Sequence, residues 1–326
     1  MSILITGGAG YIGSHMVHAL LDRGDDVVVL DNLSTGIRGL VAERATFIEG
    51  NAGDYALILD IAKEHGVTAV IHFAGSIIVP ESVEKPLDYY ANNTVNSREL
   101  IAACIEANIG NFVFSSTAAV YGMPDQIPVA EPAPTIPINP YGRSKLMTEW
   151  MLQDASRAHD FRYVALRYFN VAGADPKGRT GQSTPRATHL IKRACQAALG
   201  RVDALDIFGT DYPTKDGTGV RDYIHVSDLA TAHVNALDHL EDGGNSLTLN
   251  CGYGHGFSVR EVIDTVARVT ENHVPTREAP RRAGDPPVIV ADPSQIKEIL
   301  AWKPKYDDLD EIVRTAYGWE KRLNSV

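Results

Sequence analysis

The sequence predicts an α/β fold, a doubly wound parallel Rossmann-type sheet followed by a smaller C-terminal region. Short and uniformly apolar runs alternate with amphipathic helical patterns through the first half of the chain. Such runs are typical of parallel strands that helices cover on both faces. Beyond residue 170 the pattern loosens into shorter elements between Gly, Pro and charged turns. With 326 residues and 44% hydrophobic content, the chain can bury a large core.

The first half supplies the elements in alternating order. The runs expected as strands are SILIT (2–6), VVVLD (27–31), ATFIEG (45–50), AVIHFAG (69–75), NFVFSS (111–116) and RYVALRYFN (162–170). Helical patterns cover residues 11–23, 54–65, 86–107 and 141–158. Between Met123 and Pro140 the prolines exclude a regular helix or a central strand, so this stretch is expected to be a loop.

The pattern divides the chain into residues 1–170, the Rossmann domain, and residues 171–326, the smaller region. The segment VRDYIHVSDLATAHVNALDHL begins at Val220 and reads as a strand followed by an Asp/Ser-led helix. We therefore expect residues 218–245 to return to the first domain, so that the two parts interleave.

Composition narrows the class of partner. A formal charge of −11 disfavours nucleic acid and anionic membranes, whose binding depends on clustered Lys and Arg. No apolar run approaches the roughly 20 residues that span a bilayer, and the N-terminal residues lack a signal-peptide pattern. We therefore expect a cytoplasmic protein. Its three cysteines are far apart and match no zinc spacing, so we expect reduced thiols and no metal site.

A glycine cluster follows the first strand. In ILITGGAGYIGSH, Gly7, Gly8, Gly10 and Gly13 lie between the strand and the first helix. Glycines there allow positive φ and close approach of a pyrophosphate, which the helix N-terminus then binds. Asp31 ends the second strand about 20 residues further on, where a carboxylate accepts the ribose hydroxyls of NAD and repels the extra phosphate of NADP. The sequence therefore predicts bound NAD.

The stretch NPYGRSKLMTEW places Tyr141 and Lys145 one helical turn apart, on the same face of a helix. A tyrosine that acts as a base near pH 7 needs about 4 kcal/mol of preferential stabilisation of its phenolate, and a neighbouring ammonium supplies much of it. Thr117, at the end of the strand NFVFSST, offers a hydroxyl that would position a substrate hydroxyl and relay its proton. Together these side chains predict acid/base chemistry beside a dinucleotide.

The glycine spacing G-x-x-G-x-x-G and the Y-x-x-x-K motif resemble the extended short-chain dehydrogenase/reductase family. Further blocks recur in order along almost the whole chain, and within that family they resemble the UDP-glucose 4-epimerases: TGGAGYIGSH, VIHFAG, ESVEKPLDYYANN, SSTAAVYG, PYGRSK, LRYFNVAGA, IFGTDYPTKDGTGVRDYIHVSDLA and RRAGD. The resemblance implies an isomerase that interconverts UDP-glucose and UDP-galactose through a transient 4-keto sugar, with tightly held NAD recycled within each turnover. It also implies that the C-terminal region binds the UDP-sugar.

The resemblance also implies the roles of individual residues. Tyr141, Lys145 and Thr117 would be catalytic. The cofactor contacts would be Gly7, Gly10, Tyr11, Ile12, Gly13, Asp31, Asn32, Ser34, Asn51, Ala52, Phe73, Ala74, Gly75, Asn92, Lys145, Tyr168 and Phe169. The substrate contacts would be Thr117, Tyr141, Asn170, His189, Phe208, Arg221, Arg282, Asp285 and Ile289. The two arginines suit a diphosphate, because guanidinium groups bind phosphate oxygens bidentately.

Several positions depart from the family's pattern. Thr117 stands where Ser is commoner, and Asn51 replaces an aspartate beside the adenine, although its carbonyl still accepts a hydrogen bond. Ile77 takes the place of a lysine near the cofactor. His189 takes the place of an asparagine at the diphosphate and is expected to be pH sensitive. Ile289 is neither the large nor the small residue that sets tolerance of an N-acetyl group, so the preferred sugar stays open.

Competing functions remain. Sugar dehydratases share this fold but carry an acid just after the strand hydroxyl, where this chain has Ala118 and Ala119. The alternatives are a 4-epimerase of a UDP-N-acetylhexosamine, UDP-pentose or UDP-uronate, or a non-catalytic NAD-binding regulator, which loss of Tyr141 or Lys145 would have favoured. By family analogy we expect a homodimer formed through the helices at 86–107 and 141–158.

Overall fold

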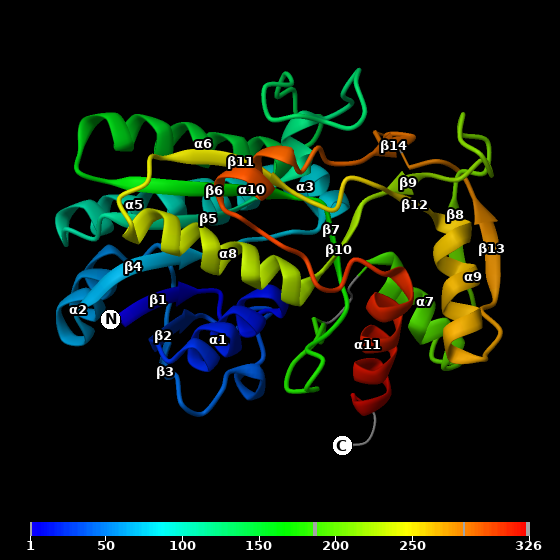
Figure 1. The fold of residues 1–326 in the computed structure, drawn as a ribbon, viewed down its shortest axis with the longest axis horizontal. Helices are drawn as coiled ribbons and strands as arrows, with labels where there is room; N and C mark the ends of the chain where they lie inside the picture. Colours follow the sequence, from blue (N-terminus) through cyan, green and yellow to red (C-terminus); the bar gives the residue numbers. More distant parts are fainter. Residues whose placement is uncertain (1, 185–187, 283, 324–326) are drawn as a thin grey trace.

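The computed structural model describes residues 2–184, 188–282 and 284–323. Its centre is a parallel seven-stranded sheet in the order β11-β6-β5-β4-β1-β2-β3 (Figure 1). The strands are β1 (Ser2–Thr6), β2 (Asp26–Asp31), β3 (Thr46–Glu49), β4 (Val67–His72), β5 (Asn111–Thr117), β6 (Arg162–Tyr168) and β11 (Leu247–Cys251). The predicted doubly wound Rossmann-type fold is confirmed.

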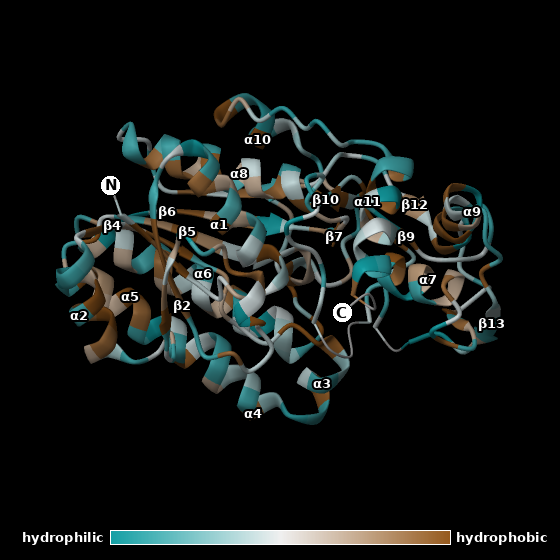
Figure 2. Cartoon of the chain, turned by 90° about the horizontal axis from the view of Figure 1, so that it is seen from below, coloured by the Kyte–Doolittle hydropathy of each residue, from teal (hydrophilic) through white to brown (hydrophobic). Residues whose placement is uncertain are grey.

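Helices cover both faces of this sheet. In Figure 2 the strands lie between α1 (Tyr11–Arg23) and α8 (Val226–Glu241) on one side and α2 (Tyr55–His65), α5 (Asn96–Glu106) and α6 (Pro140–Ala158) on the other. Successive residues of a strand therefore enter different cores: Ile3 packs toward the α1 side and Leu4 toward the α2 side. Because both faces are buried, the strand sequences are apolar throughout rather than alternating.

The helix expected over residues 86–107 is interrupted. The chain forms α4 (Pro86–Tyr89), then η2 (Tyr90–Val95), a stretch of π-helix, and then α5. A π-helical turn accommodates an extra residue, and here it brings the Asn93 side chain inward, where it is 2% exposed. Periodicity could not predict this break, because the apolar spacing changes by a single residue.

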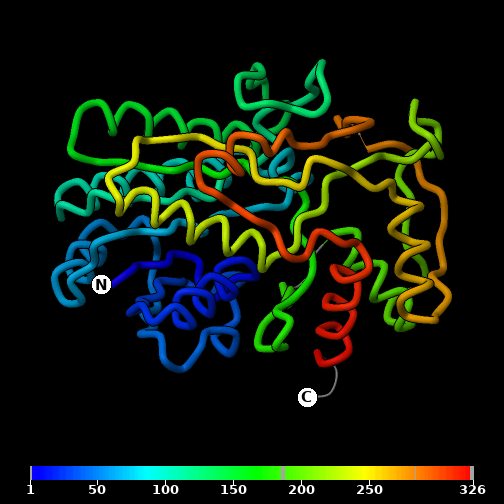
Figure 3. Tube along the Cα trace, viewed as in Figure 1, coloured from blue at the N-terminus to red at the C-terminus, as the bar shows by residue number. Residues whose placement is uncertain are grey.

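The chain returns to the sheet late. Figure 3 shows the trace crossing from the C-terminal part back along the sheet through α8 and β11. α8 packs on α1 and on β5 and β6, and β11 pairs with β6. The helix is capped by the His225 side chain, which accepts from the Ser227 backbone N–H, rather than by the predicted Asp or Ser.

Short sheets and three longer helices form most of the C-terminal part. β7 (Asn170–Ala172) pairs with β10 (Tyr223–His225), and β8 (Leu205–Phe208) pairs with β13 (Thr276–Ala279). β9 (Val220–Arg221) lies between β12 (Phe257–Ser258) and β14 (Val288–Ile289). Helices α7 (Leu190–Ala198), α9 (Val259–Thr270) and α11 (Leu309–Arg322) pack against one another. The remaining short helices are η1 (Arg38–Leu40), α3 (Val79–Glu84), η3 (Ala118–Tyr121) and α10 (Ser294–Ile299).

Among the described residues, no helix combines the length and the apolar character that crossing a membrane requires.

Candidate active site

The glycine turn between β1 and α1 is shaped by close backbone packing. Gly7 has φ +73°, and a Cβ placed there would lie 2.6 Å from the Ala74 nitrogen. A Cβ on Gly13 would lie 2.2 Å from the Gly7 carbonyl oxygen. No side chain caps the N-terminus of α1, so its first N–H groups stay available to a ligand. This cradle fits the pyrophosphate of a dinucleotide.

Asp31 is held at the carboxyl end of β2. Its carboxylate accepts the backbone N–H of Ala9 at 2.9 Å and that of Leu33 at 2.8 Å, and the residue is 8% exposed. These bonds fix the carboxylate beside the glycine turn. The Asn51 side-chain oxygen already accepts the Gly53 N–H at 2.8 Å, which leaves one lone pair for an adenine amino group.

Two asparagines of η2 hold the loop after β4 through hydrogen bonds. The Asn93 amide accepts the Ser76 N–H at 2.7 Å and donates to the Ser76 carbonyl at 2.9 Å. It also donates to the Ser144 hydroxyl on α6 at 3.0 Å. The predicted residue Asn92 donates to the Ser76 hydroxyl at 2.9 Å. Asn93 was not among the predicted contacts, and its position next to Asn92 is the one local signal for it.

Tyr141, Lys145 and Thr117 come together at the carboxyl end of β5. Asn139 caps α6 by accepting the Gly142 N–H at 2.8 Å, which orients the first turn that carries Tyr141. All three predicted side chains are buried, and the Thr117 hydroxyl accepts the Ala119 N–H at 3.1 Å. Burial raises the pKa of Tyr141, and the neighbouring Thr117 hydroxyl opposes the rise.

Lys145 contacts the carboxyl-terminal half of β5. Its Nζ donates to the Ser115 carbonyl at 3.0 Å and lies 5.0 Å from the centre of the Phe114 ring. Burial lowers the pKa of Lys145 to about 8. In this structure desolvation dominates the raised pKa of Tyr141, and the Lys145 ammonium faces the Ser115 carbonyl.

One turn beyond Lys145, Glu149 forms a buried ion pair with Arg167 of β6, with an N–O distance of 2.6 Å. The Ser116 hydroxyl, next to Thr117, donates to the same carboxylate, and Arg167 donates to the Tyr121 hydroxyl at 2.9 Å. This pair fastens α6 to β5 and β6 directly behind the site. Sequence reasoning missed it because the two residues are 18 positions apart.

The predicted substrate residues lie in the C-terminal part. Asn170 and His189 line one pocket together with Gln182 and Lys192. Burial, and then the Lys192 charge, lower the pKa of His189 to about 4, so the ring is neutral at physiological pH and the expected pH sensitivity near neutrality is absent from this structure. The Arg282 guanidinium stacks on the Phe208 ring at 3.8 Å.

Three more predicted positions complete this part. Arg221 approaches the Asp285 carboxylate at 3.5 Å. Ile289 is 7% exposed and belongs to a buried cluster that includes Ala118 and Phe169. Outside the C-terminal part, Ile77, which stands where the family has a lysine, is 47% exposed.

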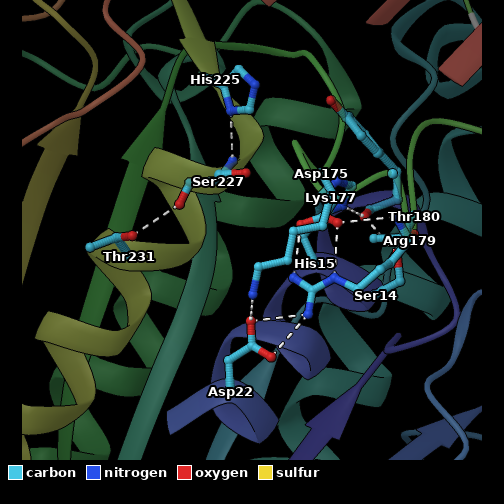
Figure 4. A network of polar contacts seen from close by, with 12 residues as sticks. Ser14, His15, Asp22, Asp175, Lys177, Arg179, Thr180, His225, Ser227 and Thr231 are labelled. Atoms are coloured by element: carbon cyan, nitrogen blue, oxygen red, sulfur yellow. Dashed lines mark hydrogen bonds and ion pairs between the residues drawn. The ribbon is translucent and has the colours of Figure 1, made fainter. Parts of the chain in front are cut away.

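A polar network joins the glycine-turn helix to the loop that leads to His189. Figure 4 shows Asp22 of α1 paired with Lys177 and Arg179, and Ser14 bonded to Thr180. The Tyr11 hydroxyl also donates to the Gly173 carbonyl at 2.6 Å. Helix α1 and residues 173–180 are therefore held together by these polar contacts. Over the whole described part of the chain, no group of three or more His, Cys, Asp or Glu could hold a metal ion.

Comparison with known proteins agrees with this geometry. Residues 3–252 match the model of the NAD dependent epimerase/dehydratase family. The chain is 61% identical to a UDP-glucose 4-epimerase of Azospirillum brasilense over 98% of its own length and 92% of the relative's. A solved UDP-glucose 4-epimerase from Brucella ovis in complex with NAD has a TM-score of 0.95 and 47% identity, with 98% of each chain covered.

A second solved relative is a UDP-glucose-4-epimerase from Stenotrophomonas maltophila with bound NAD and formylated UDP-arabinopyranose. It has a TM-score of 0.96 and 40% identity, and the match covers 100% of this chain and 99% of that one. The family match spans the glycine turn, Thr117, Tyr141 and Lys145. The chain therefore belongs to the NAD dependent epimerase/dehydratase family.

Proposed function

We propose that the protein is an NAD-dependent isomerase that interconverts UDP-glucose and UDP-galactose by epimerisation at carbon 4. The observation that carries this proposal is the burial of Thr117, Tyr141 and Lys145 together, with the Thr117 hydroxyl close enough to lower the pKa of Tyr141 and Lys145 one helical turn away. The relatives named as UDP-glucose 4-epimerases, over almost the whole chain, support the choice of reaction.

The residues described above fit NAD. The glycine turn and the open N-terminus of α1 would hold the pyrophosphate, Asp31 the adenosine ribose, and Phe73–Gly75 with Asn92 the nicotinamide half. Bound NAD would supply reversible hydride transfer at carbon 4, with no net redox change over a turnover.

The proton is moved by this chain's own side chains. Tyr141 takes the proton of the sugar's 4-hydroxyl, directly or through Thr117, and returns it when the sugar is reduced. Lys145, protonated below its pKa of about 8, places a positive charge in the same buried site. Ala118 and Ala119 provide no acid for a leaving hydroxyl, which favours epimerisation over elimination of water.

The C-terminal part would hold the nucleotide. Arg221 and Arg282 would bind the diphosphate, Phe208 would line the uracil pocket, and Asp285 would bind the uridine ribose. Asn170 and His189 would add neutral hydrogen bonds from their shared pocket. We assign residues 1–170 mainly to NAD and residues 171–326 mainly to the UDP-sugar. Of the segment 218–245, α8 packs against the first part, whereas β9 and β10 pair with strands of the C-terminal part.

A second candidate reaction is 4-epimerisation of another UDP-sugar. Ile289 is buried beside Ala118 and Phe169 and presents a smaller side chain than Tyr. A solved relative from Campylobacter jejuni, 48% identical, is named a UDP-Glc/GlcNAc 4-epimerase. A hexose with a bulkier substituent is therefore the first alternative to test.

We also propose a cytoplasmic homodimer that serves galactose metabolism. Leu87, Val95 and Trp150 are 77%, 53% and 54% exposed, and they belong to α4, η2 and α6. These three elements pack against one another, so their exposed apolar side chains suit a contact between two copies. Sedimentation of the purified protein would measure its mass in solution.

Nuclear magnetic resonance with a panel of UDP-sugars, without added NAD, tests the function. Wild type should equilibrate UDP-glucose with UDP-galactose, and Tyr141→Phe should lower kcat at least about 100-fold because the acid/base hydroxyl is lost. Tyr317→Phe, whose hydroxyl bonds to Asn272 on the surface, is the matched control and should keep full activity. Unchanged turnover in Tyr141→Phe would refute the catalytic assignment, and no epimerisation of any UDP-sugar with NAD supplied would refute the function.

A further inference from the structure

Gln182 contacts His189 through a single hydrogen bond. Its side-chain nitrogen lies 2.7 Å from Nδ1 of the imidazole, and the Gln182 residue is 8% exposed. An amide nitrogen carries only donors, so Nδ1 must be the acceptor. In a neutral ring with an unprotonated Nδ1, the proton is on Nε2. The contact therefore selects one tautomer of His189.

The tautomer matters because His189 is neutral. A neutral imidazole has one donor nitrogen, whereas a diphosphate oxygen can only accept. Within the described part of the chain, no hydrogen bond is formed at Nε2, and the ring lines the same pocket as Asn170. Only the tautomer with its proton on Nε2 can donate to an anion from this position.

Gln182 is itself held in place from the C-terminal helix. Its backbone carbonyl accepts from Lys192 Nζ at 2.7 Å, and the same ammonium donates to the Glu320 carboxylate of α11 at 2.6 Å. Lys192 and Glu320 are 8% and 4% exposed. A buried ion pair of this kind holds its partners in one geometry, so the Gln182 backbone has little freedom to turn.

We propose that Gln182 is a positioning residue that keeps the proton of His189 on Nε2, so that His189 donates a hydrogen bond to the diphosphate of the UDP-sugar. The inference rests on the proposed function, because it needs a diphosphate ligand at His189. It adds a residue that touches neither substrate nor cofactor and acts through the imidazole. An asparagine at position 189 would need no such partner, because its amide always offers donors.

The tautomer is measured directly by nitrogen NMR of the holoenzyme labelled with ¹⁵N-histidine, with His189→Asn used to assign the signal. Wild type should show a protonated Nε2. Gln182→Glu replaces the donor with a carboxylate that only accepts, so the proton should move to Nδ1. A wild-type ring protonated on Nδ1 would overturn the inference.

Binding of UDP, measured by calorimetry on the holoenzyme at pH 8, tests the consequence. Gln182→Met should weaken UDP binding about tenfold, because the donor tautomer is no longer selected. In a His189→Asn background the same change should have no further effect. Gln295→Met is the matched control, because the Gln295 side chain donates to Glu131 at 2.9 Å rather than to His189 or Glu320, and it should leave UDP affinity unchanged.

The outcomes separate the two proposals. If Gln182→Met weakens binding equally with His189 and with Asn at position 189, Gln182 does not act through the imidazole and the inference is wrong. If wild type fails to bind UDP, both the inference and the proposed function fall. If UDP binds as expected but no UDP-sugar is epimerised, the proposed function fails and the tautomer result stands.

Discussion

Lys145→Met is expected to make the cofactor-free protein more stable at pH 7 while it abolishes epimerisation. Lys145 is 3% exposed, and within the described residues no carboxylate pairs with it. Its ammonium is compensated by a hydrogen bond to the Ser115 carbonyl and by the face of the Phe114 ring. A buried charge without an ion-pair partner destabilises the folded state.

The size of the effect follows from the pKa. Lowering the Lys145 pKa from 10.5 to about 8 corresponds to about 3 kcal/mol, at about 1.4 kcal/mol per pKa unit. Losing the bond to Ser115 removes about 1 kcal/mol of stabilisation. The net gain for the methionine variant is therefore about 2 kcal/mol in the free energy of unfolding.

The sign of the pH dependence is also determined. Below pH 8 both the folded and the unfolded states carry the proton, so the folded wild type bears the full cost of the buried charge. Between about 8 and 10.5 the unfolded state binds more protons, and wild-type stability rises with pH. The advantage of Lys145→Met should therefore be greatest below pH 8 and should disappear near pH 10.5.

Urea denaturation of NAD-free protein at pH 7 and at pH 10.5 measures both quantities. Lys192→Met is the matched control, because Lys192 is equally buried but pairs with Glu320 at 2.6 Å. Removing it leaves a buried carboxylate with Arg201 as its other cation, so this variant should be less stable than wild type at pH 7. If Lys145→Met is destabilised at pH 7, or gains equally at both pH values, the argument from desolvation fails.

Three further changes test other parts of the site. Thr117→Ser should keep kcat within about threefold of wild type, whereas Thr117→Val should lower kcat at least about tenfold because the hydroxyl is lost. Steady-state assays that find the same kcat for both variants would contradict a proton relay through Thr117. Glu149→Ala should lower the free energy of unfolding by about 3 kcal/mol in urea titrations, because it leaves Arg167 buried without its carboxylate. A decrease below about 1 kcal/mol would show that the ion pair does not stabilise the fold. Gly13→Ala should purify without NAD, because its Cβ would lie 2.2 Å from the Gly7 carbonyl oxygen. Absorbance of the purified protein measures its NAD content. A normal NAD content would show that close packing at Gly13 is not required for NAD binding.

Much of the site could be predicted from local sequence. The Gly7–Gly13 turn, Asp31 and the Tyr141–Lys145 pair each belong to a short motif, and their chemistry depends on neighbours a few residues away. Asn93, Glu149 and Gln182 could not be found in this way. Their roles come from partners on other elements: Ser76, Arg167 and His189.

The sequence by itself determined the fold class and the order of strands and helices in the first half, because the spacing of apolar residues within each segment indicates which of its faces is buried. Only the tertiary structure decided that β11 completes the sheet beside β6 and that π-helix interrupts the stretch between α4 and α5. It also lowered the pKa values of Lys145 and His189. Both side chains are desolvated by segments that are distant in sequence, so the motifs around them could not predict their pKa shifts.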